Sequence, residues 1–172
     1  MNKGQIRAHF KALLNRSDCP DGLADIFIDQ ATTRIQRVLR TPAQEAQQTY
    51  TITSQTGSIS LPNNLLEIMQ VYMDGVALTR IPLHEMIQAQ KTGELGTPRF
   101  MCRQQGQILL HPQPTTGTVY LDYYAEFPNL ATDADSNALT VIGSDILTYT
   151  ALAYAADYFM DERAAIFEQK SG

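Results

Sequence analysis

The sequence EIMQVYMDGVALTRI, residues 67–81, places the dipeptide Asp74-Gly75 between two apolar runs. Asp-Gly is favoured in two-residue type I′ turns, because both turn positions need a positive φ that aspartate tolerates and glycine adopts freely. A turn of this type joins two antiparallel strands directly. Residues 67–81 therefore predict a tight β-hairpin in the middle of the chain.

Two further hairpins are predicted on either side of this one. Apolar residues alternate over 50–61 around Gly57, which predicts a short hairpin. The sequence FMCRQQGQILLHP at 100–112 predicts another hairpin, which turns at Gln105-Gly106.

A strand and a short helix complete the middle of the chain. Strict alternation over 119–126 predicts a strand with one apolar face, formed by Val119, Leu121, Tyr123 and Ala125. Residues 82–90 predict a short helix that closes near Gly93. We therefore expect an antiparallel β part over residues 48–128.

The first 46 residues have helical periodicity instead. Ile6, Phe10, Leu13 and Leu14 recur at the spacing of an amphipathic helix. A second helix is predicted from Pro20 to the Thr41-Pro42 dipeptide, since the residue before a proline is disfavoured in the α region. Its expected apolar stripe consists of Leu23, Ile26, Phe27, Ala31, Ile35, Val38 and Leu39.

A long C-terminal helix is expected over residues 143–170, with Ser144 as N-cap and Asp145 in the first turn. Apolar residues occupy nearly all of its faces, so nearly all of its faces must be covered. Either the helix is buried within its own bundle, or a partner covers part of it. The fold class is therefore α+β: a single unit with a helical bundle (1–46 and 143–170) and an inserted β-hairpin platform.

Composition and charge exclude several classes of protein. With 172 residues, 44% of them hydrophobic, the chain can form a sizeable core, and disorder over most of its length is excluded. The net charge of −5 argues against binding nucleic acid by neutralising phosphates. The charge is uneven: residues 1–40 carry seven Lys or Arg against four Asp (+3), and the remainder carries six against fourteen acids (−8). Neighbouring subunits could pair these ends, or the charges could simply be solvated.

The sequence contains no complete catalytic, nucleotide-binding or metal-binding motif. His84-Glu85 resembles half of a zinc-protease helix, but the second ligand position holds Gln88. Asp133, Asp135 and Asn137 resemble the start of a calcium loop, which then lacks its glycine and its final glutamate. The two cysteines, Cys19 and Cys102, have no metal-ligand spacing. We expect no cofactor, no metal and no enzymatic activity.

Two alternative functions remain open at this point. One is a small hydrolase that uses His111 or His84 with nearby carboxylates. The other is a DNA-binding regulator, for which the sequence provides no recognised module. We expect neither a signal peptide in MNKGQIRAHFKALLNR nor a membrane span in residues 146–160, because a span needs about 20 apolar residues. Synthesis in the cytoplasm is therefore expected.

The order of four segments resembles a known family. These are ATTRIQRVLR (31–40), SISLPNNLLEIMQVYMDGVALTRI (58–81), GTPRFMCRQQGQILLHPQPTTGTVYLDYYAEFPNL (96–130) and ILTYTALAYAADYFMDERAAIFEQ (146–169). Each motif is loose, but together, in this order, they resemble the head-to-tail adaptor proteins of tailed bacteriophages, which include the tail tubular protein A of short-tailed phages. The resemblance runs from about Leu23 to Phe167.

This resemblance implies a structural protein of the virion, made in the host bacterial cytoplasm. It implies a ring, of twelve copies, that docks under the portal protein, surrounds the DNA channel without sequence-specific binding and carries the tail or nozzle protein. Residues then expected at subunit or portal interfaces are Lys3, Arg7, Lys11, Arg34, Arg37, Arg40, Tyr154, Tyr158, Phe159, Arg163 and Phe167. The hairpin tips expected to face the tail are Asp74, Gly75, Gln105 and Gly106.

Overall fold

The computed structural model describes residues 1–171 and confirms the predicted α+β class. Its α-helices are α1 (Lys3–Leu14), α2 (Asp21–Val38), α3 (Leu83–Gln90), α4 (Ala138–Ile142), α5 (Ser144–Tyr158) and α6 (Ala164–Ser171), and a 3-10 turn, η1, covers Pro42–Gln44. Its strands are β1 (Glu45–Ile52), β2 (Ser58–Ser60), β3 (Leu65–Met73), β4 (Val76–Ala77), β5 (Thr79–Arg80), β6 (Phe100–Gln104), β7 (Gln107–His111) and β8 (Gly117–Ala125).

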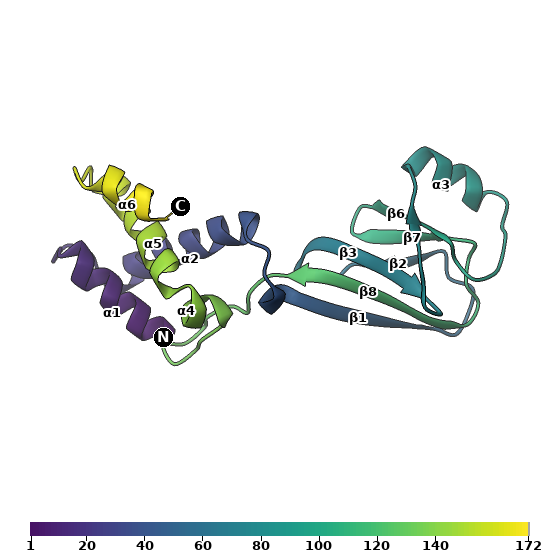
Figure 1. Cartoon of the computed structure of the whole chain (residues 1–172), viewed down its shortest axis with the longest axis horizontal. Coiled ribbons are helices and arrows are strands. Elements are labelled where there is room, and N and C mark those ends of the chain that lie inside the picture. The colour runs from purple at the N-terminus through teal and green to yellow at the C-terminus, as the bar shows by residue number, and fades with distance from the viewer. Residues whose placement is uncertain (172) are drawn as a thin grey trace. The chain divides into compact units, whose positions relative to one another are not determined.

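The chain divides into two compact units. Residues 1–43 and those from 127 onward form the helical unit, which contains α1, α2, α4, α5 and α6. Residues 44–126 form the β unit, which contains the strands and α3 (Figure 1). Each unit has its own cluster of buried apolar side chains.

Helix α1 agrees with its predicted amphipathic pattern. Ile6, Phe10 and Leu14 are fully buried. The Asn2 side chain accepts a hydrogen bond from the backbone N–H of Gln5, and the Gln5 side chain accepts one from the backbone N–H of Asn2. This capping box sets the start of the helix.

Helix α2 buries most of its predicted apolar stripe. Phe27, Ala31 and Ile35 are buried, and Leu23 and Leu39 pack against the core. Ile26 and Val38 were wrongly included in the stripe, since they are 52% and 83% exposed. The helix also ends at Val38 rather than at Thr41, because Leu39 already has extended backbone angles.

The predicted single helix over 143–170 is wrong, since the structure divides this range between α5 and α6, and the short helix α4 before it was not predicted. Asn137 caps α4 through a capping box with Thr140, and Gly143 separates α4 from α5. Ser144 is the first residue of α5 and forms no side-chain cap. After Tyr158 the chain turns at Met160, which has a left-handed φ of 52°, and α6 follows.

Helix α5 lies at the centre of the helical unit. It contacts α1, α2, α4 and α6, which bury most of its length. Its two ends are less covered, because Ile146 is 41% exposed and Tyr158 is 62% exposed. Its own unit therefore covers the middle of this helix and leaves both ends accessible.

The β unit contains two four-stranded sheets, with the orders β1-β8-β3-β4 and β2-β7-β6-β5. The predicted hairpin over 50–61 is wrong: β1 pairs with β8 and β2 pairs with β7, so Gly57 lies in a connection between sheets. Local alternation identifies strands but does not determine their partners. The predicted apolar face of β8 is confirmed, since its inward residues are buried.

Both predicted tight turns are confirmed. Asp74 and Gly75 have φ values of 53° and 76°, and Gln105 and Gly106 have 49° and 82°. The second strand of the predicted hairpin over 67–81 is shorter than predicted, however. Only β4 pairs with β3, while β5 pairs in parallel with β6. The chain thus crosses between sheets within residues 76–80, and the second sheet is mixed rather than antiparallel.

Candidate interaction surface

The predicted interface cation Arg7 is paired within its own chain. Its guanidinium donates to both carboxylate oxygens of Asp25, at 2.6 and 2.8 Å, and to both of Asp133, at 2.6 and 2.9 Å. These hydrogen bonds, first to Asp25 and then to Asp133, raise the pKa of Arg7 above its ordinary value. The hydrogen bonds from Arg7 lower the pKa of the Asp133 carboxyl. Asp133 is thus the partner of an arginine rather than a calcium ligand.

Lys3 and Lys11 also have partners in the helical unit. The Lys3 ammonium donates to the backbone carbonyl of Leu130 at 3.1 Å and lies 3.6 Å from the Asp25 carboxylate. The Lys11 ammonium donates to Asp21 at 2.6 Å. The basic stripe of α1 therefore binds acids of its own chain.

Two further predicted cations connect helices. Arg34 on α2 forms a bidentate pair with Glu168 on α6. Arg163 pairs with Asp161 and donates to the Leu14 carbonyl at the end of α1, at 3.0 Å. Both arginines hold α6 in place, which is a structural role within the subunit.

The last two predicted cations lie at the end of α2. Arg40 donates to the carbonyls of Gln36 and Leu39, at 2.8 and 2.7 Å, and so satisfies acceptors at the helix end. Arg37 is exposed and, within residues 1–171, pairs with no carboxylate. Arg37 is therefore available to a partner.

The predicted aromatic contacts differ in accessibility. Phe167 belongs to the core at 7% exposed, and Tyr154 and Phe159 are half-buried. Tyr158 is 62% exposed, although one edge packs against Phe27 with ring centroids 5.6 Å apart. Of these four residues, Tyr158 offers the largest free surface.

The predicted tail-facing residues lie at two hairpin tips of the β unit. Asp74 and Gly75 connect β3 to β4, and Gln105 and Gly106 connect β6 to β7. All four are exposed.

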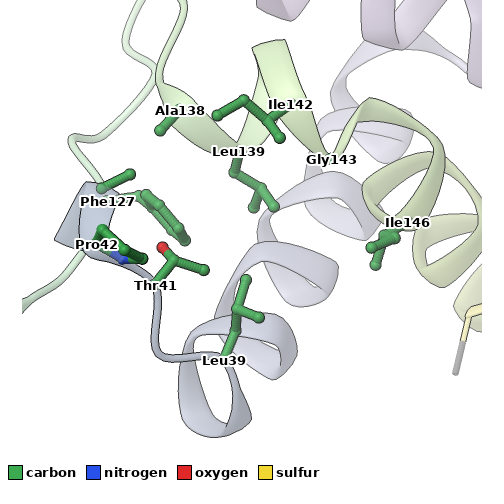
Figure 2. Close-up of a pocket in the computed structure, with 10 residues that line it drawn as sticks. Leu39, Thr41, Pro42, Phe127, Ala138, Leu139, Ile142, Gly143 and Ile146 are labelled. Carbon is green, nitrogen blue, oxygen red and sulfur yellow. The ribbon is translucent and has the colours of Figure 1, made fainter.

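An apolar groove was not predicted from the sequence. It has a volume of about 500 Å³ and is formed by the segment after α2, by Phe127, and by α4 with the start of α5 (Figure 2). Its lining residues are Leu39, Thr41, Pro42, Ala43, Phe127, Ala138, Leu139, Ile142, Gly143 and Ile146. None of these side chains is charged. We call this site the α4 groove.

A second apolar surface lies where α5 turns into α6. Met160 is 93% exposed, Tyr158 is 62% exposed and Ile166, in the first turn of α6, is 54% exposed. We call these three residues the α5–α6 corner. Large apolar side chains gathered at a surface are typical of a protein interaction site.

A polar pocket in the β unit tests the hydrolase hypothesis. The pocket, about 420 Å³, includes His111, whose Nε2 atom lies 3.5 Å from the Glu94 carboxylate. A general base needs a free imidazole nitrogen within reach of a nucleophile. Here the other nitrogen, Nδ1, is buried without a hydrogen-bond partner, and Thr97 is the one hydroxyl residue that lines the pocket. This arrangement does not form a catalytic constellation.

The remaining candidate chemistry has structural explanations. His84 is exposed, 3.8 Å from Glu85. Asp135 accepts hydrogen bonds from Thr132, and Asn137 caps α4. Both cysteines are free and buried, and desolvation raises the pKa of Cys19. In the described part of the chain no group of three or more His, Cys, Asp or Glu residues could hold a metal ion.

Comparison with protein families decides the class. The family model for the SU10 adaptor protein matches residues 1–171. The chain belongs to the SU10 adaptor protein family. The resemblance to phage adaptors is thereby confirmed, and no curated protein gives a significant match.

Membership makes this adaptor a structural phage protein of the head-to-tail junction and a component of the virion. Adaptors of this kind contact portal and tail proteins. None of the helices in residues 1–171 has the length and hydropathy that a membrane span requires.

Proposed function

We propose that this adaptor forms a ring of twelve identical subunits beneath the portal vertex and extends the channel through which the DNA passes. The ring gives the tail or nozzle protein its attachment surface and helps to retain the packaged genome. The family match over residues 1–171 carries this proposal. The resemblance of its segments to the head-to-tail adaptor proteins of tailed bacteriophages supports the same role.

Several surface features support an assembly role. Most cations of α1 and α2 form ion pairs within the subunit, so they stabilise the subunit itself and are not proposed to contact other proteins. Arg37 and Tyr158 remain exposed among the predicted interface residues and are proposed to contact a neighbour or the portal. The exposed tips at Asp74-Gly75 and Gln105-Gly106 are proposed to contact the tail protein.

Charge is consistent with passage of DNA rather than binding. The net charge of −5 opposes accumulation of phosphate at the surface. The adaptor is therefore proposed to surround double-stranded DNA without reading its sequence. No catalytic step is required of it.

Negative-stain electron microscopy of the adaptor, with and without the portal protein of its own phage, tests this function. The expected result is a twelve-fold ring on the portal. An adaptor that stays monomeric in the presence of its portal protein would contradict the proposal. DNA binding with a steep dependence on salt would instead favour a DNA-binding regulator.

A further inference from the structure

Strand β1 is the longest edge strand of the β unit. It lies at one margin of the sheet β1-β8-β3-β4 and pairs with β8 alone, as Figure 1 shows. The other edge strands, β4, β2 and β5, contain two, three and two residues, whereas β1 contains eight. One whole side of β1 is therefore open to an additional strand.

The hydrogen bonds of the neighbouring strands show which backbone groups of β1 point outward. The Leu78 N–H donates to the Val71 carbonyl at 2.8 Å, so the backbone groups of Val71 point away from β8. Direction alternates along an antiparallel strand, so the backbone groups of the next residue, Tyr72, point toward Tyr120 on β8. Tyr120 turns its own backbone groups toward β3 and away from Thr49, its opposite residue on β1. The N–H and C=O of Thr49 therefore point out of the sheet edge.

Four residues of β1 present backbone groups at this edge. Alternation adds Glu45, Gln47 and Thr51 to Thr49, and all four are exposed. Within residues 1–171, the partner of these outward groups is the side chain of Gln48, which donates to the Thr49 carbonyl at 3.3 Å. The edge is thus a row of backbone donors and acceptors that an extended chain can bind.

The edge also lacks the usual protections. Natural sheets shield their edges with lysine, proline, bulges or very short strands. Strand β1, EAQQTYTI, contains no lysine or proline and pairs with β8 without a register shift. Strand β3, on the other side of the same sheet, has two such shifts. A long unshielded edge is typical of a site that accepts a strand from another chain.

A second copy of this chain does not fit this edge in a ring. Within residues 44–126, β1 is the one long strand whose edge is unshielded, so two copies would have to join β1 to β1. Such a contact uses the same surface twice and has a two-fold axis. Subunits of a ring with a single rotation axis contact each other through two different surfaces instead. The occupant is therefore a different protein.

The position of the edge indicates which protein this is. Tyr50 of β1 and Met73 of β3 both lie opposite Val119, so β1 and β3 end at the same end of the sheet. Met73 leads directly into the turn Asp74-Gly75, which is proposed to contact the tail protein. The open edge of β1 thus continues from that proposed contact.

We propose that β1 accepts an extended segment of the tail protein as an added β-strand. This inference rests on the proposed function and identifies how the tail protein attaches. The added strand binds the outward backbone groups of β1. Its side chains alternate, with apolar residues beside Tyr50 and Ile52, which contact the core, and polar residues beside Thr49 and Thr51.

Binding of the tail protein to portal-bound rings tests this contact. Thr49→Pro removes one outward N–H and obstructs the edge, but removes no hydrogen bond to β8. Rings should still form on the portal, and the affinity for the tail protein of the same phage, measured by biolayer interferometry, should fall at least about tenfold. Ala77→Pro is the matched control, because the Ala77 N–H also points outward, at the opposite edge of the sheet. This control should bind as tightly as the unmodified adaptor.

Hydrogen–deuterium exchange of the unmodified adaptor tests the contact without a variant. The tail protein should slow exchange in a peptide that covers residues 45–52. No protection there, or equal losses of affinity in both proline variants, would overturn the proposed contact while the ring stands. A Thr49→Pro variant that is folded by circular dichroism but forms no ring would show that β1 joins subunits, which also overturns it. If the unmodified adaptor forms no ring on its portal, the proposed function fails and this inference fails with it.

Discussion

The Arg7 guanidinium donates two hydrogen bonds, of 2.6 and 2.8 Å, to the carboxylate of Asp25 and so connects α1 to α2. Both side chains are largely withdrawn from solvent, with 14% of Arg7 and 24% of Asp25 exposed. A second pair from the same guanidinium reaches Asp133, on the loop before α4. One side chain thus holds three segments of the helical unit together.

Replacing Arg7 should destabilise the subunit. Arg7→Met leaves the half-buried Asp25 carboxylate without this partner, and we expect the free energy of unfolding to fall by about 2 kcal/mol. Urea denaturation followed by circular dichroism measures this. Lys11→Met, which removes the more exposed pair with Asp21, should cost no more than about 0.5 kcal/mol. If both variants lose the same free energy of unfolding, Arg7 stabilises the subunit no more than an exposed surface ion pair does.

Acid stability should depend on Asp161. Its pKa is lowered to about 2, mainly by the side-chain hydrogen bond from Arg163 and then by the backbone N–H of Arg163. Because the folded-state pKa lies below the unfolded value of about 3.9, the stabilisation is complete above pH 4 and is lost as the pH falls toward 2. Asp161→Asn should therefore lose less stability than the unmodified adaptor across this interval. Thermal unfolding at pH 5, 4, 3 and 2 measures the difference.

Glu162→Gln is the matched control for that experiment, since it removes one neighbouring negative charge without touching Arg163. Its stability should fall with pH as steeply as that of the unmodified adaptor. If Asp161→Asn shows the same steep fall, the Arg163 pair does not contribute to acid stability.

Replacing Gly117 should destabilise the subunit. Its φ of 113° is unfavourable for other residues, and an added Cβ would lie 2.3 Å from Cε of Met73, so the end of that buried side chain would have to move. Gly117→Ala should therefore lower the free energy of unfolding by about 1–3 kcal/mol. Gly22→Ala is the counterpart, because this helical position has open space around it and alanine should stabilise it by about 0.5–1 kcal/mol. The free energy of unfolding, measured by urea denaturation, should fall for Gly117→Ala and rise for Gly22→Ala. A change in the same direction in both variants would contradict this prediction.

Replacing Met160 by glycine should stabilise the subunit. Its left-handed φ of 52° disfavours a residue with a Cβ, and its side chain is 93% exposed. Met160→Gly should therefore raise the stability of the isolated subunit by about 1 kcal/mol. Urea denaturation of the isolated subunit measures this gain, and Met160→Ala, which keeps a Cβ, is the matched control that should show no such gain. A lower stability for Met160→Gly would show that the methionine side chain contributes to the fold.

Local signals in the sequence were sufficient for several elements. The turns at Asp74-Gly75 and Gln105-Gly106 were predictable because few residues adopt positive φ readily. The α1 core face and the inward face of β8 followed from periodicity alone. Each of these features depends on neighbours that are close in the chain.

Features that depend on distant residues were not predictable. Asp133, which pairs with Arg7, lies 126 residues further along the chain, so the basic stripe of α1 was assigned to neighbouring subunits. Strands β1 and β2 are neighbours along the chain but belong to different sheets, where they pair with the distant strands β8 and β7. The break at Met160 carries no glycine or proline. The α4 groove also depends on α4, whose signal was the Asn137–Thr140 capping box within a polar loop.

The helical unit is assembled from both ends of the chain, with the β unit inserted between them. During translation, residues 44–126 leave the ribosome before the segment that supplies α4, α5 and α6, so the β unit can fold while the helical unit is still half made. The α4 groove, which joins residues 39–43 to residues 127–146, does not exist on such a nascent chain. Synthesis order thus delays formation of the α4 groove until the subunit is nearly complete.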